Sequence, residues 1–369
     1  MSQPAVLHIR GTDLYGSPER LIIGQMQHLS EIHSVAASFV KPGTDNRFLK
    51  EVTKAGMEAV EIADYGGFDR KIPARIREIV GRFKVELIVT HEYKSSVYGY
   101  LACRKLHVPQ ICYFHGWTSE DRKVRFYNWV DRQVLRRAER VVTVSKASAA
   151  RLVDNGVPEA NIEVVYNAID VDLNEAPPER TPNEAPVIGV VGRLSHEKGL
   201  HHFIDAITEL HRQEHEFRAR IIGSGPDEAK LRQMAAQDGL DEIVTFEGFR
   251  DDLDVVYPQL DFLVLPSLSE GHPVVILEAW KHAVGVVATR AGGIPEVVEH
   301  ERNGLLTEIG RPDLLAATIA RALNDLPLMN HFGRVGFEEV RTKYSYPKQA
   351  EQLHRVYTET IRRKRDGYA

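Results

Sequence analysis

Short apolar segments alternate with longer amphipathic segments along the first part of the chain. Helix-like stretches such as SPERLIIGQMQHLSE separate the apolar segments AVLHI, SVAASFV, MEAVEI, ELIVTH, PQICYFH, RVVTVS and IEVVY. Apolar runs of about four to eight residues are typical of buried strands, and amphipathic stretches are typical of helices that cover a sheet. The alternation therefore predicts an α/β fold built from repeated βαβ units around a parallel sheet.

A polar, proline-rich stretch interrupts this pattern after IEVVY, and the pattern then starts again with PVIGVVGRL, ARIIGSG, EIVTFEG, DFLVLPS and GVVATR. Two domains are predicted, at residues 1–170 and 187–345, with a linker at 171–186. The last segment, 346–369, has helical periodicity and the basic end RRKR, which suits a helix C-terminus. We expect this helix to pack back on the first domain.

The composition is that of an ordinary globular protein. The chain has 369 residues, of which 43% are hydrophobic and 27% charged, and this length suits two domains that each bury a core. The amino terminus lacks the pattern of a signal peptide, and no apolar run is long enough to span a membrane. We therefore expect a cytoplasmic protein. Cys103 and Cys112 have no metal-ligand spacing and are interpreted as reduced packing residues.

The charge is distributed unevenly. Residues 1–170 contain 24 Lys and Arg against 20 Asp and Glu, a net +4, which leaves 23 against 32, a net −9, for the remainder. The basic segment 122–140 includes Phe126, Tyr127 and Trp129. Such a helix could rest on anionic lipid at the inner face of a membrane, or it could be a solvated helix face beside the core. Nucleic-acid binding is not favoured, since the net charge is −5 and no recognition motif occurs.

Two loops that follow predicted strands of the second domain are candidate phosphate-binding loops, because ligands of parallel sheets bind beyond the carboxyl ends of the strands. In GRLSHEKG, the cations Arg193 and Lys198 precede a helix, which suits a diphosphate; a surface turn with solvated cations is the alternative. In GSGPD, Gly223 opens a tight turn where backbone can approach a ligand. Neither a P-loop nor a complete GxGxxG is present, so a nicotinamide dehydrogenase is not favoured.

The loop PSLSEGHPVVILEA is the most informative. Glu270 precedes a helix predicted to begin near Pro273, and Glu278 lies about one and a half turns inside that helix. The two carboxylates and the free amides of the helix start can face one ligand. Glu278 stands in the apolar run VVILEAW, so we expect a hydroxyl or cationic partner for it. The alternatives are a structural ion pair for Glu278 and solvent exposure for Glu270.

Together with the glycine turn AGGIPE, these loops resemble those of the retaining GT-B glycosyltransferases, a family that includes bacterial mannosyl- and glucosyltransferases. The similarity rests on GRLSHEKG, GSGPD, FEGFRDD, the Glu-x7-Glu pair and AGGIPEVVEHERNGLL. It implies two Rossmann-like βαβ domains that face a cleft. It also implies transfer of a hexose-type sugar from a nucleotide diphosphate sugar, with UDP the first expectation, in the synthesis of a cell-surface polysaccharide or a glycolipid.

The resemblance implies roles for individual residues. Arg193 and Lys198 would hold the donor diphosphate, Glu270 would contact hydroxyls of the transferred sugar, and Glu278 would bind the ribose. Gly223 would also contact the donor. Phe249 and Arg250 would border the nucleobase. Amides at the helix start would meet sugar and phosphate oxygens, at Gly271, His272, Val274 and Val275.

The first domain carries two further matching loops. Gly16 lies in YGSPER, which resembles the family's glycine-rich opening loop, and His115 lies in HGW at the end of a predicted strand. The resemblance makes His115 a contact of the donor sugar, although a lone histidine at a strand end can also be structural. The sequence departs from the family pattern at Ser17, at Ala168 and in the stretch 281–285.

The resemblance implies front-face attack, in which a donor phosphate oxygen takes the acceptor proton. No cofactor and no metal are expected, because Arg, Lys and helix amides already supply positive potential; Asp170 and Asp172 are interpreted as structural. The expected partners are a nucleotide sugar and an acceptor that is a saccharide, a lipid-linked saccharide or a small metabolite. Other GT-B activities, such as an epimerase, and a catalytically silent sugar-nucleotide-binding subunit are the alternatives.

Overall fold

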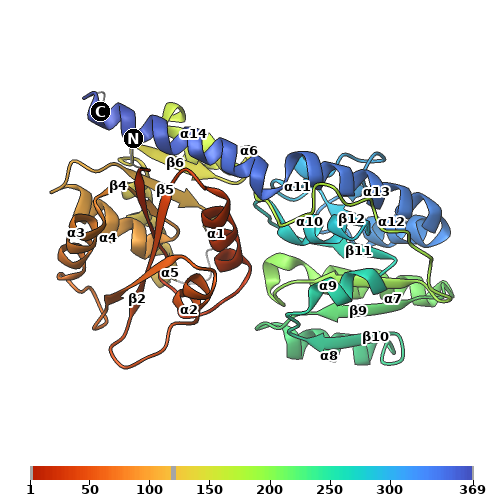
Figure 1. Ribbon diagram of the computed structural model, residues 1–369. Helices are drawn as coiled ribbons and strands as arrows, with labels where there is room; N and C mark the ends of the chain where they lie inside the picture. Colours follow the sequence, from red (N-terminus) through yellow and green to blue (C-terminus); the bar gives the residue numbers. More distant parts are fainter. Residues whose placement is uncertain (1–2, 118–121, 368–369) are drawn as a thin grey trace. The chain divides into compact units, whose positions relative to one another are not determined.

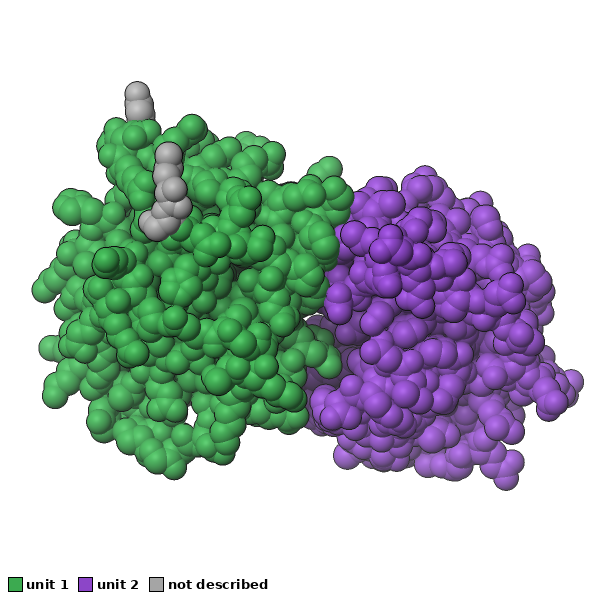
Figure 2. Space-filling model, in the orientation of Figure 1, with its two compact units in different colours: residues 1–167, 346–369 green, residues 168–345 purple. Residues whose placement is uncertain are grey.

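The chain folds into two compact units. The computed structural model describes residues 3–117 and 122–367 (Figure 1). The first unit contains residues 1–167 and 346–369, and the second contains residues 168–345 (Figure 2). Each unit has its own parallel sheet covered by helices, so the predicted α/β class with two Rossmann-like domains is confirmed.

The first unit contains a seven-stranded parallel sheet in the order β3-β2-β1-β4-β5-β6-β7. Its strands are β1 (Ala5–Ile9), β2 (His33–Val40), β3 (Glu58–Ala63), β4 (Val85–Thr90), β5 (Gln110–Phe114), β6 (Arg140–Thr143) and β7 (Ile162–Val164). Its helices are α1 (Ser17–His28), α2 (Arg47–Lys54), α3 (Ile72–Phe83), α4 (Tyr93–Cys103), α5 (Arg122–Leu135), α6 (Lys146–Asp154) and α14 (Tyr346–Arg365).

Both faces of this sheet are buried, which explains why its strands read as continuous apolar runs. Val6 on β1 packs in a core with residues of α14 such as Leu353 and Tyr357, whereas its neighbour Leu7 packs on the opposite face with α3 and α4. The carboxy-terminal helix therefore completes the core of the first unit. Both cysteines are free thiols, Cys103 at the end of α4 and Cys112 in β5.

The second unit contains a six-stranded parallel sheet in the order β10-β9-β8-β11-β12-β13. Its strands are β8 (Val187–Val191), β9 (Arg218–Ile222), β10 (Val244–Gly248), β11 (Phe262–Leu265), β12 (Gly285–Thr289) and β13 (Leu305–Thr307). Its helices are α7 (Leu200–Arg212), α8 (Glu228–Gln237), α9 (Leu253–Val256), α10 (Val274–Lys281), α11 (Ile294–Val297), α12 (Pro312–Asn324) and α13 (Leu326–Lys343). A 3-10 turn, η2 (His196–Lys198), precedes α7.

The segment 171–186 lies within the second unit and is held there by hydrogen bonds. The Arg180 guanidinium donates to the carbonyl oxygens of Leu260 and His282. The Asn183 amide donates to a carboxylate oxygen of Asp261 at 2.7 Å. The side chains of Arg180 and Asn183 thus attach this proline-rich stretch to the residues that flank β11 and α10.

Each sheet reverses its strand order next to its first strand. In the first unit β1 pairs with both β2 and β4, and in the second unit β8 pairs with both β9 and β11. Two loops diverge at such a point and leave a crevice at the carboxyl ends of the strands, where parallel sheets bind their ligands. Arg193 and Lys198 follow β8 and Glu270 follows β11 at this point, whereas other candidate residues follow β5 and β10.

Candidate functional site

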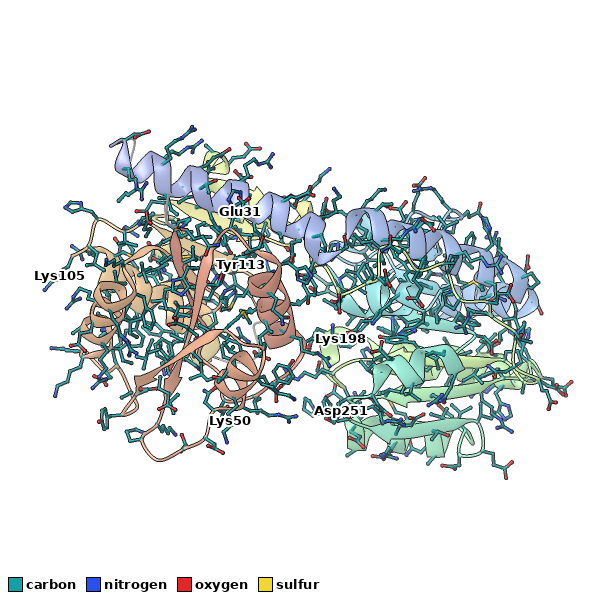
Figure 3. The ribbon with its side chains drawn as sticks, viewed as in Figure 1. Glu31, Lys50, Lys105, Tyr113, Lys198 and Asp251 are labelled. Carbon is teal, nitrogen blue, oxygen red and sulfur yellow. The ribbon has the colours of Figure 1, made fainter. Side chains whose placement is uncertain are left out.

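In the second unit, the loops after β8 and β11 are joined by an ion pair. Lys198 Nζ lies 2.7 Å from Glu270 Oε1, and Ser267 Oγ donates to the same oxygen at 2.7 Å. Only 8% of the Glu270 side chain is exposed, against 27% for Lys198, which Figure 3 labels. The structure therefore places Glu270 as a fixed, largely buried carboxylate and excludes its interpretation as a solvated loop residue.

Three loops pack backbone against backbone around Glu270. Gly292 has a φ of +53°, and a Cβ atom there would lie 1.9 Å from the Glu270 carbonyl oxygen. Gly199 has a φ of +65°, and a Cβ atom there would lie 2.1 Å from the Pro266 carbonyl oxygen. The Gly293 amide also donates to the Glu270 carbonyl oxygen at 3.2 Å. Gly199 of GRLSHEKG and Gly292 of AGGIPE are therefore required by the close approach of these loops.

Gly223 has a comparable packing role beside β8. Its φ is +137°, and a Cβ atom there would lie 1.8 Å from the Gly192 carbonyl oxygen. Its amide donates to the Gly248 carbonyl oxygen at 2.7 Å. The sequence predicted that the absence of a side chain at Gly223 lets backbone approach a ligand. In the structure, it lets the loop at Gly192 pack directly against Gly223.

Arg193 follows β8 on the same side of the sheet as Lys198. Its side chain is exposed, and within residues 3–117 and 122–367 no Asp or Glu forms an ion pair with it. One cation of GRLSHEKG is thus engaged by Glu270, while the other faces solvent. Together they form a positive region at the carboxyl end of β8, which suits an anionic ligand.

Glu278 lies in the second turn of α10 and is half-buried. The Tyr257 hydroxyl donates to its Oε2 at 3.1 Å and also lies 3.3 Å from the Val275 carbonyl oxygen. The expectation that Glu278 has a hydroxyl partner is therefore confirmed. Tyr257 was not identified from the sequence, because it lies in a helix-like stretch that contains no recognisable motif.

The amides that were predicted to meet a ligand lie just before α10 and in its first turn. Gly271 and His272 precede the helix, and Val274 and Val275 are half-buried in its first turn. The His272 ring is 4% exposed and lies 5.2 Å from the Tyr344 ring. Burial lowers the pKa of His272 to about 3, so its imidazole is neutral at physiological pH.

Phe249 and Arg250 follow β10. The Phe249 ring is 67% exposed, the state expected of a ring that is free to stack on a ligand. Arg250 is engaged instead: its Nη2 lies 2.6 Å from Asp252 Oδ2 and its Nη1 lies 2.9 Å from Glu247 Oε2. Phe249 is therefore the more available of the two for a planar ligand.

In the first unit, His115 follows β5 at the edge of a pocket of about 460 Å³. Solvent reaches His115, but the protein around it desolvates the imidazole, which together with Arg10 lowers its pKa to about 4. The ring is thus neutral near pH 7. The ionisable residues that line the pocket with it are Arg10, His91, Glu92, Tyr93, Tyr113, Tyr127 and Asp131.

The charged residues and the second histidine of this lining were not identified as site residues from the sequence. Arg10 and His91 directly follow β1 and β4. They could have been found from the sequence, because ligands of parallel sheets bind beyond the carboxyl ends of the strands. Glu92 caps α4, and burial raises the pKa of its carboxyl. Asp131 accepts a hydrogen bond from Trp117 Nε1 at 2.9 Å, and burial raises its pKa to about 6. Nothing in the local sequence distinguishes Asp131 from a surface helix residue.

Gly16 is the residue that precedes α1. Its amide donates to Glu19 Oε2 at 2.8 Å, and Glu19 Oε1 accepts from Arg10 Nε at 3.0 Å. Gly16 has an ordinary extended conformation, with a φ of −131°. The backbone conformation at this position therefore does not itself require glycine.

The exposed face of α5 carries two large aromatic side chains. Phe126 is 59% exposed and Trp129 55% exposed, and their rings lie 6.1 Å apart. Tyr127, on another face, stacks on Tyr93 at 4.9 Å. Within the described ranges, no helix has the length and apolar character needed to cross a bilayer.

Comparison with known proteins agrees with this arrangement. The model of the family Glycosyl transferases group 1 matches residues 185–325, and that of Glycosyltransferase Family 4 matches residues 29–173. WcaL of Escherichia coli, named as a candidate glycosyltransferase of colanic acid biosynthesis, is 30% identical over 277 residues, which cover 71% of this chain and 68% of WcaL. The 2-deoxystreptamine glucosyltransferase of Streptomyces kanamyceticus is 34% identical over 234 residues, 60% of each chain.

Solved structures share the fold across both units. Anabaena HepE, whose structure was determined with UDP-glucose, superposes with a TM-score of 0.83 at 22% identity, over 96% of this chain and 99% of HepE. A sucrose-phosphate synthase from Thermosynechococcus elongatus superposes with a TM-score of 0.81 at 18% identity, over 96% and 98% of the two chains. At these identities the likeness establishes the GT-B fold.

Proposed function

This chain belongs to the group 1 glycosyl transferase family, and on that premise we propose that it moves a hexose-type sugar from a UDP-sugar to an acceptor hydroxyl. Two similar proteins support the choice of nucleotide and of sugar. HepE was determined with UDP-glucose, and the Streptomyces kanamyceticus relative is named a glucosyltransferase. The WcaL name supports a role in polysaccharide synthesis, with glycolipid synthesis as the related possibility.

The observation that carries the proposal is the fixed Lys198–Glu270 pair beside the exposed Arg193, at the carboxyl ends of β8 and β11. A sugar diphosphate presents hydroxyls at one end and negative charge next to them. Lys198 and Ser267 both donate to Oε1 of Glu270, and in this proposal Oε2 accepts from sugar hydroxyls. Lys198 and Arg193 supply the positive charge for the adjacent diphosphate.

The chemistry follows from this charge distribution. When the bond between the anomeric carbon and the phosphate oxygen breaks, negative charge grows on the diphosphate, and Arg193 and Lys198 stabilise it more strongly than in the ground state. The acceptor oxygen attacks the same face, and its proton passes to the leaving phosphate oxygen. The configuration of the anomeric carbon is thereby retained.

The remaining residues bind and orient the donor. Glu278, held by Tyr257, accepts hydrogen bonds from the ribose hydroxyls, and the exposed Phe249 ring borders the base with Arg250 beside it. The neutral His115 imidazole forms a hydrogen bond to a sugar hydroxyl without adding a positive charge. Further donor contacts come from the backbone at Gly16, Gly223, Gly271, His272, Val274 and Val275.

Two further features belong to the proposal. Transfer requires no metal ion, because the cations of the β8 loop and the amides of α10 supply the positive potential. The protein contacts a membrane surface peripherally through the aromatic face of α5.

Donor binding tests the proposal. We expect UDP to bind more tightly than GDP or ADP by titration calorimetry, with no change on addition of EDTA. In Lys198→Ala, UDP affinity should fall at least about tenfold, because a charge-assisted hydrogen bond contributes about 1.5–3 kcal/mol. Lys281→Ala is the matched control: its pair with Asp254 is solvent-exposed, at 33% and 74%, and lies at the far end of α10.

Three results would count against the proposal. These are absence of binding by all three nucleotides, loss of UDP binding with EDTA, and equal affinity losses in Lys198→Ala and Lys281→Ala. Thermal melts of both variants show whether each is folded before its affinity is compared.

A further inference from the structure

A second pocket lies directly beside the pocket that contains His115. It has a volume of about 650 Å³ and is formed by α4, α5 and the loop at Gly67 and Phe68. Tyr93 and Tyr127 line both pockets. Their rings stack at 4.9 Å and are inclined by 14°. The stacked pair is thus a common wall between two cavities within the first unit.

The second pocket is apolar. Aromatic rings and the valines Val97 and Val130 form its lining, and Phe68 stacks on Tyr98 at 5.5 Å. Among the described lining residues, the one charged side chain is Lys94, which Asp64 neutralises with an ion pair of 2.6 Å. A charged or strongly hydrated group would lose water here without gaining a partner, so this pocket selects an uncharged apolar group.

The size of the pocket points to a chain. A closed cavity of about 150 Å³ accommodates benzene, and this pocket is several times larger. Its volume falls within the range of about 300–1,000 Å³ that is typical of ligand sites. Phe68 and Phe126 are 62% and 59% exposed where they line it, so the pocket opens to solvent along apolar side chains. An alkyl chain can enter along that path and extend outward.

The pocket at His115 has a more polar lining. Its lining includes the carboxyls of Glu92 and Asp131, the guanidinium of Arg10 and the imidazole of His115. Such a set of donors and acceptors suits a ligand with several hydroxyl groups. A pocket lined by charged and polar groups and an apolar pocket that share one wall therefore fit the two ends of a single amphiphilic molecule.

We propose that the acceptor is an alkyl-chain glycolipid, whose hydroxylated head occupies the pocket at His115 and whose chain passes the Tyr93–Tyr127 pair into the apolar pocket. This inference rests on the proposed glycosyltransferase function and names the acceptor class for it. The head group places a hydroxyl beside His115, and the chain supplies the binding energy through burial of apolar surface. Tyr93, Val97 and Val130 are the specificity-determining residues.

Chain-length dependence tests this inference. The probes are methyl, hexyl and octyl β-glucoside below their micelle concentrations, and binding to the full-length protein is measured by calorimetry with saturating UDP. We expect octyl glucoside to bind at least about tenfold more tightly than methyl glucoside. In Val97→Trp, which fills the apolar pocket, octyl affinity should fall to that of methyl glucoside. Val130→Trp fills the same pocket from α5 and provides a second variant.

Val153→Trp is the matched control, because Val153 lies on α6 and is 41% exposed. It should retain the full gain with chain length. Absence of a gain with chain length in the wild type, including absence of binding by every glucoside, would overturn the inference. A gain that persists in both pocket-filling variants would also overturn it.

The same titrations separate this inference from the donor proposal. UDP affinity should be equal in the wild type and in all three tryptophan variants. A protein that binds octyl glucoside but no nucleotide would refute the proposed donor and leave the amphiphile site in place. A protein that binds UDP and shows no chain-length gain would refute the acceptor class alone. A phenyl glucoside that binds more tightly than the octyl compound would replace the alkyl chain with an aromatic group.

Discussion

Buried histidines are the residues whose environment the sequence describes least well. His8 lies inside the apolar run AVLHI, and its Nδ1 is 3.3 Å from His91 Nε2 at the carboxyl end of the next strand. Both side chains are 1% exposed. Burial lowers the pKa of His8 to about 3 and lowers that of His91 well below its ordinary value. Both imidazoles are therefore neutral in the folded protein.

These histidines should make the protein acid-sensitive. An unfolded histidine titrates near pH 6.5, whereas native His8 titrates near 3, so the unfolded state binds more protons between these values. The stability that His8 contributes is then present above about pH 6.5 and is lost as the pH falls toward 3, with a loss of about 2 kcal/mol at pH 5. We expect the free energy of urea unfolding to decrease accordingly.

The slope of stability against pH is the readout, so a loss of stability in a variant does not obscure the result. His8→Gln should flatten the slope between pH 5 and 7, while replacement of the exposed His211 by Gln should leave it unchanged. Identical slopes in the wild type and His8→Gln would contradict the assignment of His8 as a buried neutral imidazole.

At the scale of elements, the candidate site depends on loops that pack without side chains between them. The loop before α10 and the turn before α11 meet where Gly292 approaches the Glu270 carbonyl oxygen. Glu270 is held twice, by this backbone contact and by the Lys198 ion pair. The conformation of the loop after β11 is therefore set by the loops after β8 and β12.

Replacement of Gly292 should be far more harmful than replacement of a glycine in open space. In Gly292→Ala, the left-handed backbone is strained and the Cβ atom meets the Glu270 carbonyl oxygen at 1.9 Å. We expect a loss of about 2–4 kcal/mol in urea unfolding, with weaker UDP binding. Gly239→Ala is the matched control, since its φ is +73° with no atom within 4 Å, and it should cost about 1 kcal/mol. Equal losses in the two variants would refute the packing argument.

At the scale of the whole molecule, each unit has a complete core, and the carboxy-terminal helix completes the first. Leu353, Val356 and Tyr357 of α14 join the core formed by β1, β4 and β5, where Figure 3 labels Tyr113. The first unit also has the exposed aromatic residues Phe126 and Trp129 in the basic segment 122–140. Membrane contact is therefore expected to be a property of the first unit.

Flotation with liposomes tests that expectation. Wild-type protein should float with vesicles that contain phosphatidylserine, and binding should decrease at high salt because part of the attraction is electrostatic. The double variant Phe126→Ser, Trp129→Ser should bind several-fold less, since the apolar anchors are lost. Val255→Ser, Leu314→Ser changes two exposed apolar residues of the second unit and serves as the control. Equal flotation of both double variants would remove α5 as the contact.

The sequence by itself determined the two parallel sheets, because strands buried on both faces must be apolar throughout and helices must be amphipathic. The segment AVLHI corresponds to β1, and the segment DFLVLPS contains β11. Glu270, Glu278, Arg193 and Lys198 could be singled out because they follow strands or stand in apolar runs.

Only the tertiary structure decided the partners of these residues. The contacts of Lys198 with Glu270 and of Tyr257 with Glu278 join positions that are far apart in the chain, and local periodicity contains no information on such pairs. The same holds for the apolar pocket beside His115, since Phe68, Val97 and Phe126 lie on separate segments and read individually as core or surface positions. Periodicity reports which face of an element is buried, whereas the packing of elements determines which buried faces leave a cavity between them.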